Sequence, residues 1–479
     1  MLRTLFVLLL ITGGVYYSLQ GPFYALLFYL WNAYFRPEDW LWTNFVSNLR
    51  LSYIIGLYLV LTSLLSRQRF VLNGKIGLIL LFLLHTFLST WFSEHFAYSW
   101  LYWQDFLKST LITYLIIVLV NDLPQFRLVL LVMVLSLGCE GAKQGWIYLL
   151  TSPGGANANP SAFLGDNNGV AIGMAMLVPL CALLAQTTQR KWAQRFYWFL
   201  LVGILYRALS TYSRGGFLAC LAMGGMYCLR SQKKLRTLLG MGIIIVAVLS
   251  SLSDAFWDRM ETIQTYEEVQ DDSALGRLHF WAVARQMAKA NPFLGVGYMG
   301  YNPSYNDYDF SNGRYGRNRS VHSSYFGVLA ELGYQGAALY GLIFLCALYS
   351  CHRVRRLAST NSTLSEGKKY ATALEASLVT FLVGSIFLPA QYNEMFWHYI
   401  GLALALEKLV TRSSLIGRAS AQKSQRDCPV PTPPPLQSRV RPARLARPMV
   451  GRRSAVLGVR GRVPRRVKAA VPQHNVVPQ

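Results

Sequence analysis

The chain has 479 residues, of which 53% are hydrophobic and only 14% are charged. Soluble domains usually carry about 25% charged residues, so the composition excludes an ordinary soluble globular protein. Apolar runs near twenty residues recur, and each is long enough to cross a hydrocarbon core as a helix. The runs are continuous and lack the alternation of barrel strands. The sequence therefore predicts an all-α polytopic integral membrane protein.

The net charge of +24 is unevenly distributed. Residues 411–479 hold fifteen Lys/Arg and one acidic residue, Asp427, and account for more than half of the excess. This stretch is rich in proline, arginine and valine and has no periodicity, which is typical of a disordered segment. We expect a cytoplasmic tail that binds anionic lipids. Nucleic acid is not an expected partner, because no aromatic residues are interleaved with the basic ones.

Thirteen apolar segments are predicted spans, ten within residues 1–252 and three within 323–410. The polar segment 253–322 separates the two groups. The first two spans are short, so residues 1–35 alternatively form one re-entrant unit, which leaves twelve or thirteen spans. In chain order the segments are 4–18, 21–35, 47–65, 76–94, 104–121, 126–150, 164–187, 196–212, 215–230, 237–252, 323–350, 371–389 and 394–410.

Charge orients these spans. Four connections are basic and fall on one side of the membrane, which the positive-inside rule makes the cytoplasm. The opposite face then receives the polar segment 253–322 as one large extracytoplasmic loop, periplasmic in a bacterial inner membrane. The basic connections are 67–75, 190–195, 230–236 and 353–369.

The polar segment has predicted structure of its own. Asp272 or Ser273 can cap a helix over 272–290. Three large side chains share one face of this helix at four-residue spacing. The face belongs either to a functional site or to a helix that lies on the membrane with snorkelling arginines. The three residues are Arg277, Trp281 and Arg285.

A stretch rich in glycine and tyrosine follows. Its GVGYMG at 295–300 matches the dinucleotide fingerprint GxGxxG, but no strand precedes it and no helix is expected after it. We therefore expect the glycines to serve tight turns. The clustered tyrosines suit a sugar-facing surface and equally a membrane interface. They are Tyr298, Tyr301, Tyr305, Tyr308 and Tyr315.

Two arginines lie close to apolar helices. Arg214, in SRGGF, occupies an extracytoplasmic turn and either snorkels to the interface or forms an anion site. Arg207 lies about two turns deeper on the same helical face and is a functional candidate by default. Two partners are open to Glu140: Arg207, or Lys143 at i+3.

His322 follows Arg314, Arg317 and Arg319 and begins a span. An imidazole has an unperturbed pKa of about 6.5, which suits general-base chemistry at neutral pH. At the mouth of a span and amid guanidinium groups, it is placed to meet a phosphate-bearing lipid. The sequence has no HExxH motif, Cys/His cluster or Walker loop, so no metal, nucleotide or other cofactor is expected.

Three further polar residues begin spans. Asp166 and Asn167 either cap a helix or line a cavity. Glu394 likewise either caps a helix or lines the cavity, and in the cavity it could orient His322.

Four motifs, taken in order, resemble the O-antigen ligase superfamily of lipid-linked glycan ligases and polymerases. They are SRGGF at 213–217, GRLHFW at 276–281, NPFLGVG at 291–297 and RSVHSSYFGVLAELGYQG at 319–336. GCEGAKQGWIYLLTSPGG at 138–155 and PSAFLGDNN at 160–168 resemble the subgroup of O-glycosylation ligases associated with exosortase systems. The resemblance covers roughly residues 1–410.

The resemblance implies a donor, a mechanism and site residues. A glycan on undecaprenyl diphosphate would be transferred to a lipid, protein or glycan acceptor at the outer face of the inner membrane, without metal or ATP. Arg214 and Arg277 would bind the diphosphate, with Arg319 and Arg207 as further candidates, and His322 would be the base. Guanidinium groups match phosphate oxygens geometrically, and fixed cations stabilise the charge that develops on the leaving oxygen.

The sequence departs from the family pattern at two places. The family often has His-Asn where this chain has His322-Ser323, and the basic tail lies outside the pattern. A repeat-unit polymerase of the same superfamily is the main alternative, because ligase and polymerase differ only in the acceptor. A lipid-linked oligosaccharide transporter would instead have charges along a central pathway and no large one-sided loop.

Overall fold

The computed structural model of the chain consists of α-helices. Among the residues it describes there are sixteen α-helices, one short 3-10 helix and no β-strand, so the predicted all-α polytopic class is confirmed. Contacts group Met1–Ser424 into one unit and Gln425–Gln479 into another. The structure describes residues 2–40, 50–66, 70–231, 234–250, 254–261, 272–359 and 364–427.

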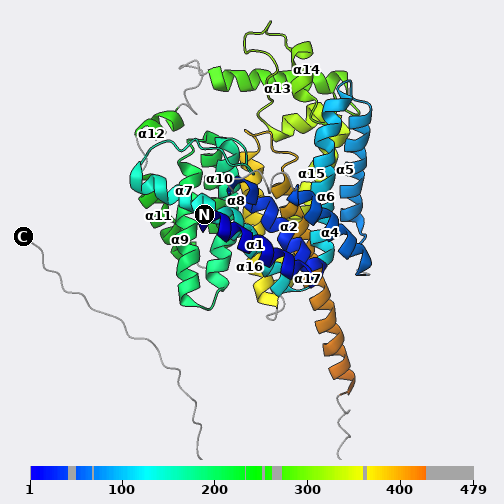
Figure 1. The fold of residues 1–479 in the computed structure, drawn as a ribbon, viewed down its shortest axis with the longest axis vertical. Helices are drawn as coiled ribbons and strands as arrows, with labels where there is room; N and C mark the ends of the chain where they lie inside the picture. The colour runs from blue at the N-terminus through cyan, green and yellow to red at the C-terminus, as the bar shows by residue number, and fades with distance from the viewer. Residues whose placement is uncertain are drawn as a thin grey trace, which may run out of the picture. The chain divides into compact units, whose positions relative to one another are not determined.

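The helices follow the predicted spans (Figure 1), and each of the thirteen segments overlaps one helix outside the polar segment. Before the polar segment come α1 (Leu2–Ser18), α2 (Pro22–Phe35), η1 (Pro37–Trp40), α4 (Leu51–Leu65), α5 (Gly74–Trp91), α6 (Phe96–Leu119), α7 (Leu123–Thr151), α8 (Asn167–Thr187), α9 (Lys191–Leu209), α10 (Arg214–Arg230) and α11 (Lys234–Leu249). The polar segment holds α12 (Asp254–Glu261), α13 (Asp272–Ala290) and α14 (Tyr301–Tyr308). After it come α15 (Ser324–Ser359), α16 (Ser365–Gly384) and α17 (Glu394–Asp427).

Four helices among the described residues are long and apolar enough to cross a membrane by length and composition alone: α5, α7, α8 and α15. The structure differs from the sequence predictions in two places. α17 continues to Asp427, although we expected no regular structure from residue 411. A short helix, α14, follows the GVGYMG stretch, where none was expected. The predicted disorder of residues 428–479 lies outside the described residues.

Short polar side chains fix where several helices begin. Asn73, Asp122, Asp166 and Ser213 each accept a hydrogen bond from a backbone N–H in the first turn of the helix that follows. These N–H groups have no partner within the helix, so the caps satisfy them at the ends of apolar segments. The helix predicted over 272–290 is confirmed as α13.

α8 is the central helix of the bundle. It packs against α7, α9, α10 and α16, and nearly every residue from Gly169 to Ala185 is buried. Small side chains allow this close packing: a Cβ on Gly216 of α10 would lie 2.4 Å from Cβ of Ala171, and one on Gly384 of α16 would lie 2.7 Å from Ile172. The core therefore forms around a helix that is apolar on all sides.

Two buried carboxylates join helices at one end of the bundle, and Glu407 of α17 is the first. Its carboxylate accepts hydrogen bonds from Nζ of Lys75 at 2.5 Å, from Nη1 of Arg353 at 2.8 Å and from the hydroxyl of Ser350 at 2.7 Å. The carboxylate thus connects α5, α15 and α17. Three donors compensate for the desolvation that a buried charge suffers.

Glu375 of α16 is the second. It binds Arg230 at 2.7 Å and Arg355 at 3.1 Å, and so connects α10, α15 and α16. The two clusters include residues from three of the four basic connections, which places these three connections at the same end of the bundle. The assignment of that end to the cytoplasm remains a prediction from the positive-inside rule.

α15 is broken at Gly333, where φ is +68° and ψ is −171°. The NPFLGVG stretch of the polar segment lies against this break. The backbone N–H of Val296 donates to the carbonyl of Ala330 at 2.9 Å, and the N–H of Tyr334 donates to the carbonyl of Pro292 at 2.9 Å. The loop therefore supplies partners that a continuous helix would have supplied itself.

α5 satisfies the remaining carbonyls at the break. The Ser89 hydroxyl donates to the carbonyls of Leu294 at 2.8 Å and Glu331 at 2.9 Å. Nε2 of His85 lies 2.9 Å from the carbonyl oxygen of Leu332. The broken helix, the loop and α5 are thus held together by backbone groups that would otherwise be buried without partners.

The glycines of GVGYMG serve this junction. Gly295 and Gly297 have φ of +68° and +110°. A Cβ on Gly295 would lie 2.3 Å from the carbonyl carbon of Glu331, and one on Gly297 would lie 2.1 Å from the Ser93 hydroxyl. The expected turns are therefore present, and close approach to α15 and to the end of α5 is a second reason for glycine.

The polar segment has a small hydrophobic core. It lies between α13, α14 and the first turns of α15, at one end of the bundle (Figure 1). The residues are Phe280, Val283, Ala284, Met287, Tyr301, Tyr305, Val321 and Ala330. Because Val321 belongs to this core, the core also fixes the position of the next residue, His322.

We predict that Gly295→Ala destabilises the protein far more than Gly313→Ala. Both glycines have positive φ, but a Cβ on Gly313 meets nothing within 4 Å, whereas one on Gly295 overlaps the α15 backbone. Gly313→Ala should cost about 1 kcal/mol, and Gly295→Ala more than about 3 kcal/mol. Thermal unfolding in detergent measures both, and equal melting temperatures for the two variants would contradict the proposed junction.

Candidate functional site

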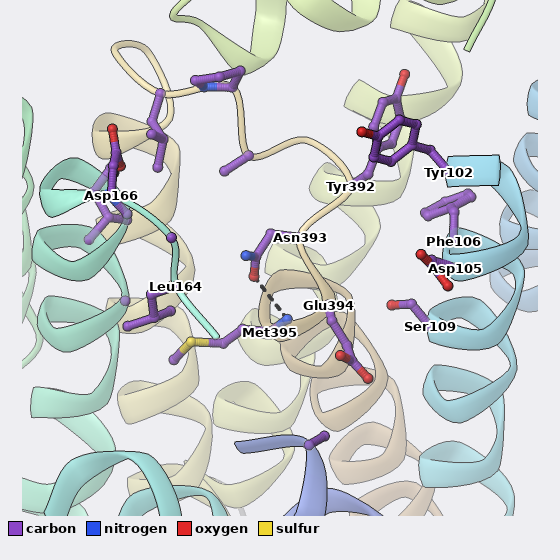
Figure 2. A pocket seen from close by; sticks show the side chains of 18 of the residues that line it. Tyr102, Asp105, Phe106, Ser109, Leu164, Asp166, Tyr392, Asn393, Glu394 and Met395 are labelled. Atoms are coloured by element: carbon purple, nitrogen blue, oxygen red, sulfur yellow. Dashed lines mark hydrogen bonds between the residues drawn. The ribbon is translucent and has the colours of Figure 1, made fainter. Parts of the chain in front are cut away.

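A cavity of about 820 Å³, here called the main cavity, opens at the end of the bundle that carries the polar segment. Its wall is built from α2, α6, α8, the first turn of α17 and the residues just before α15. Figure 2 shows Tyr102, Asp105 and Ser109 of α6 on one side, with Asp166 on the other. Its acidic, basic and histidine side chains are Arg36, Glu38, Asp105, Lys108, Asp166, His322 and Glu394.

His322 lies in this wall in an unusual backbone conformation. Its φ is +48°, a region that residues other than glycine rarely adopt. Neighbouring residues hold it there: Ser324 donates its backbone N–H to Ser385 at 2.9 Å and its hydroxyl to Leu388 at 2.6 Å. Backbone strain of this kind costs about 1–3 kcal/mol and is concentrated at functional sites.

The surroundings of His322 favour its neutral form. Burial lowers the pKa of the imidazole below its usual 6.5, and the positive charges of Arg277 and Arg319 lower it further. The carboxylate of Asp166 acts in the opposite direction but does not reverse the shift. A neutral imidazole at neutral pH is the form that can accept a proton.

α13 carries Arg277 and packs on α15. Trp281 stacks on Phe326 of α15 with ring centroids 5.1 Å apart, and Arg285 lies 5.9 Å from the same ring. The guanidinium of Arg319 lies 5.5 Å from the ring of Phe280. The face predicted from four-residue spacing therefore packs on α15, which argues against a helix lying freely on the membrane.

A His–Asp pair fixes α13 to the loop that carries Arg319. Nε2 of His279 lies 2.7 Å from Oδ1 of Asp309, and both side chains are buried. Burial raises the pKa of Asp309, but hydrogen bonds from Ser311, Gly313 and His279 lower it by more, so the carboxyl stays ionised. The pair holds the arginine-bearing loop but does not line the main cavity.

Arg214 begins α10, where the preceding serine caps the helix. A Cβ on Gly215 would lie 3.1 Å from Phe387, and one on Gly216 would lie 2.4 Å from Ala171, so SRGGF allows α10 to pack tightly on its neighbours. Arg214 is not among the residues that line the main cavity. Its predicted contact with diphosphate remains a prediction.

Arg207 is buried and already bound to the protein. Its guanidinium donates to the backbone carbonyls of Asn157 at 2.8 Å and Asn159 at 2.5 Å, which fixes the connection between α7 and α8. It lines a second cavity, of about 490 Å³, and not the main one. Glu140 pairs with Lys143 at 2.6 Å, as the i+3 alternative expected. The geometry thus gives Arg207 a structural role, and its predicted contact with diphosphate remains a prediction.

Asp166 has both of the roles that were left open. It caps α8 by accepting from the N–H of Gly169 at 2.9 Å, and it lines the main cavity. Asn167 donates to the carbonyl of Thr211 at 3.3 Å, which joins α8 to the turn before α10. Asn167 does not line the main cavity.

Glu394 also lines the main cavity, at the start of α17. Its carboxylate lies 3.7 Å from Nε2 of His398, whose other ring nitrogen lies 3.0 Å from the Tyr34 hydroxyl. Among the described residues no hydrogen bond joins Glu394 to His322. Glu394 therefore shares the cavity with His322, but the structure does not show it orienting the imidazole.

Sequence reasoning missed the α6 wall of the cavity. Asp105 and Lys108 form an ion pair at 2.9 Å near the start of the predicted span 104–121. Charged residues in a span mark a functional site by default, so this signal was present in the sequence. Of the clustered tyrosines only Tyr298 lines the main cavity, whereas Tyr301 and Tyr305 lie in the small core.

Two comparisons with known families match different parts of the chain. Residues 199–341 match the family model described as O-Antigen ligase, and residues 2–187 match one described as a family of unknown function, DUF5935. Each match spans less than half of the chain. The first supports the O-antigen ligase superfamily, and with the helices it supports a multi-pass membrane protein with glycosyltransferase-like activity. No curated protein matches the chain.

The main cavity joins the two matched regions. Asp105 and Asp166 come from the region of unknown function, and Tyr298 and His322 come from the ligase region. Glu394 lies outside both. Among the described residues no group of three or more His, Cys, Asp or Glu side chains is arranged to hold a metal ion.

We predict that Arg207→Lys lowers stability by about 2 kcal/mol, because one ammonium cannot replace a guanidinium that binds two carbonyls. Thermal unfolding and limited proteolysis between α7 and α8 measure the effect. Arg190→Lys, at an exposed position, is the matched control. Unchanged stability together with a raised KM for a lipid-linked donor would show that Arg207 instead binds diphosphate.

Proposed function

We propose that the protein transfers a glycan from an undecaprenyl-diphosphate donor to an acceptor hydroxyl, with His322 as the general base. One observation carries this proposal: His322, whose pKa is lowered by burial and by the charges of Arg277 and Arg319, lies in a cavity shared by the ligase-matched region and the N-terminal helices. The acceptor is a lipid, a protein or a glycan. The resemblance to exosortase-associated ligases belongs to the same proposal.

The proposed reaction is one substitution at the anomeric carbon. His322 accepts the proton of the acceptor hydroxyl as its oxygen attacks that carbon from the side opposite the diphosphate. The bond between the anomeric carbon and the diphosphate oxygen breaks, and the electron pair leaves with undecaprenyl diphosphate. Arg277 and Arg319 bind the leaving diphosphate, and Arg214 is a further candidate. Fixed guanidinium groups stabilise this charge without reorganisation during the reaction.

The location follows from charge and from the position of the site. Three basic connections lie at the end of the bundle marked by Glu375 and Glu407. The positive-inside rule makes that end cytoplasmic, so the main cavity faces the periplasm of a bacterial inner membrane. The tail is then cytoplasmic, where its basic residues bind anionic lipids.

A transfer assay tests the proposal. Membranes with matched amounts of wild type, His322→Ala or Arg277→Ala receive an undecaprenyl-diphosphate-linked oligosaccharide. We expect wild type to consume the donor, and both variants to lose at least about a hundredfold in rate. A product carrying one transferred glycan indicates a ligase, and a ladder of repeats indicates a polymerase. Wild-type rates in both variants would refute the mechanism and favour transport.

The pH dependence provides an independent prediction. The folded-state pKa of His322 is depressed, so the reactive neutral form is lost only as pH falls below the usual range of histidine. Arg319→Gln removes one of the charges that depress this pKa, so the acid limb of kcat/KM should move to higher pH. Arg314→Gln, on the same loop, is the control. An acid limb that does not move in Arg319→Gln would contradict the role of His322 as the base.

A further inference from the structure

Two side chains that line the main cavity, Ser109 of α6 and Asn32 of α2, have polar atoms without hydrogen-bond partners in the part of the chain that the structure describes. Ser109 and Asn32 are buried residues, with exposed fractions of 5% and 1%, and the Ser109 hydroxyl and Oδ1 of Asn32 are themselves buried. Neither atom has a hydrogen-bond partner among the described residues, and both side chains line the cavity. Asn32 is held in place by its amide nitrogen, which donates to Ser52 at 2.7 Å. Because both side chains line the cavity, a polar ligand bound there would supply the partners that these two atoms lack within the described ranges.

Carboxyl groups line the same cavity as these two side chains. Figure 2 shows Asp105 and Ser109 on α6 facing the side of the cavity where Glu394 lies. The whole lining has four carboxyl groups and two permanent cations, Arg36 and Lys108, so the carboxyl groups remain in excess even with Lys108 paired to Asp105 at 2.9 Å. The arginines that affect His322, Arg277 and Arg319, are outside this lining. The main cavity therefore favours a ligand that donates hydrogen bonds and carries no negative charge.

Aromatic rings complete this part of the cavity. Tyr102 and Tyr392 lie near Asp105 in Figure 2, and Tyr298 packs on Tyr392 with ring centroids 4.2 Å apart. Apolar and aromatic walls with a few placed polar groups are typical of small-molecule sites. A sugar ring has an apolar face and a rim of hydroxyls. The apolar face would pack on the aromatic rings, and the hydroxyls would donate hydrogen bonds to the unpaired acceptors.

We propose that this pocket, formed by Asn32, Asp105, Ser109 and Glu394, binds the sugar bonded to the diphosphate and selects a neutral sugar over a uronate. The proposal rests on the proposed function, because transfer takes place at the anomeric carbon of that sugar, close to His322. The carboxyl groups accept from sugar hydroxyls and repel a sugar carboxylate. The cost of placing like charges together supplies the discrimination.

The test uses two undecaprenyl-diphosphate-linked glycans that differ only in the first sugar, glucose or glucuronate. We expect the full-length protein to transfer the glucose donor at least about tenfold faster in kcat/KM. Asp105→Asn removes a negative charge, so it should reduce the ratio of kcat/KM for the glucose donor to kcat/KM for the glucuronate donor. Ser109→Ala should raise KM for the glucose donor, whereas Thr110→Val should not, because Thr110 is a neighbouring buried hydroxyl that does not line the cavity.

Each outcome bears on one proposal. Equal rates with both donors, or a ratio that Asp105→Asn leaves unchanged, would overturn sugar selection while transfer itself still stands. If neither donor is transferred by wild type, the proposed function fails. Thermal stabilisation of the intact protein by the two donors then still tests the pocket: protection by the glucose donor alone supports it, and equal protection by both overturns it.

Discussion

The break in α15 at Gly333 is the constraint on which the arrangement of the site depends. A helix within a membrane has no water to satisfy its backbone, so an interruption persists only where protein groups replace the lost partners. Here the NPFLGVG loop and two side chains of α5 replace them, and Gly295 and Gly297 let the loop approach. The need to satisfy the broken backbone thus fixes the polar segment to the bundle.

The packing of the polar segment also fixes the position of His322. The small core between α13, α14 and α15 includes Val321, and the turn after α16 holds Ser324, so His322 is positioned from both sides along the chain. The same core orients α13, whose Arg277 lowers the pKa of the imidazole. Strained backbone and a shifted pKa at one residue therefore have one structural origin.

The two ends of the bundle use charge differently. At one end Glu375 and Glu407 each form ion pairs with two basic side chains, and these ion pairs join five helices. At the other end the carboxyl groups of the main cavity outnumber the permanent cations, and two lining side chains, Asn32 and Ser109, have buried polar atoms without partners among the described residues. The first arrangement stabilises the fold, whereas the second is suited to a polar ligand.

The sequence by itself determined the fold class, the positions of the thirteen helices, the helix at α13 and the turns of GVGYMG, because these depend on local hydropathy, capping and backbone freedom. Only the tertiary structure decided which polar residues share a cavity. It separated Arg207 from His322, brought Asp105 and Glu394 into the same cavity as His322, and placed α13 on α15. These outcomes depend on packing between segments distant in the chain, which local patterns do not encode.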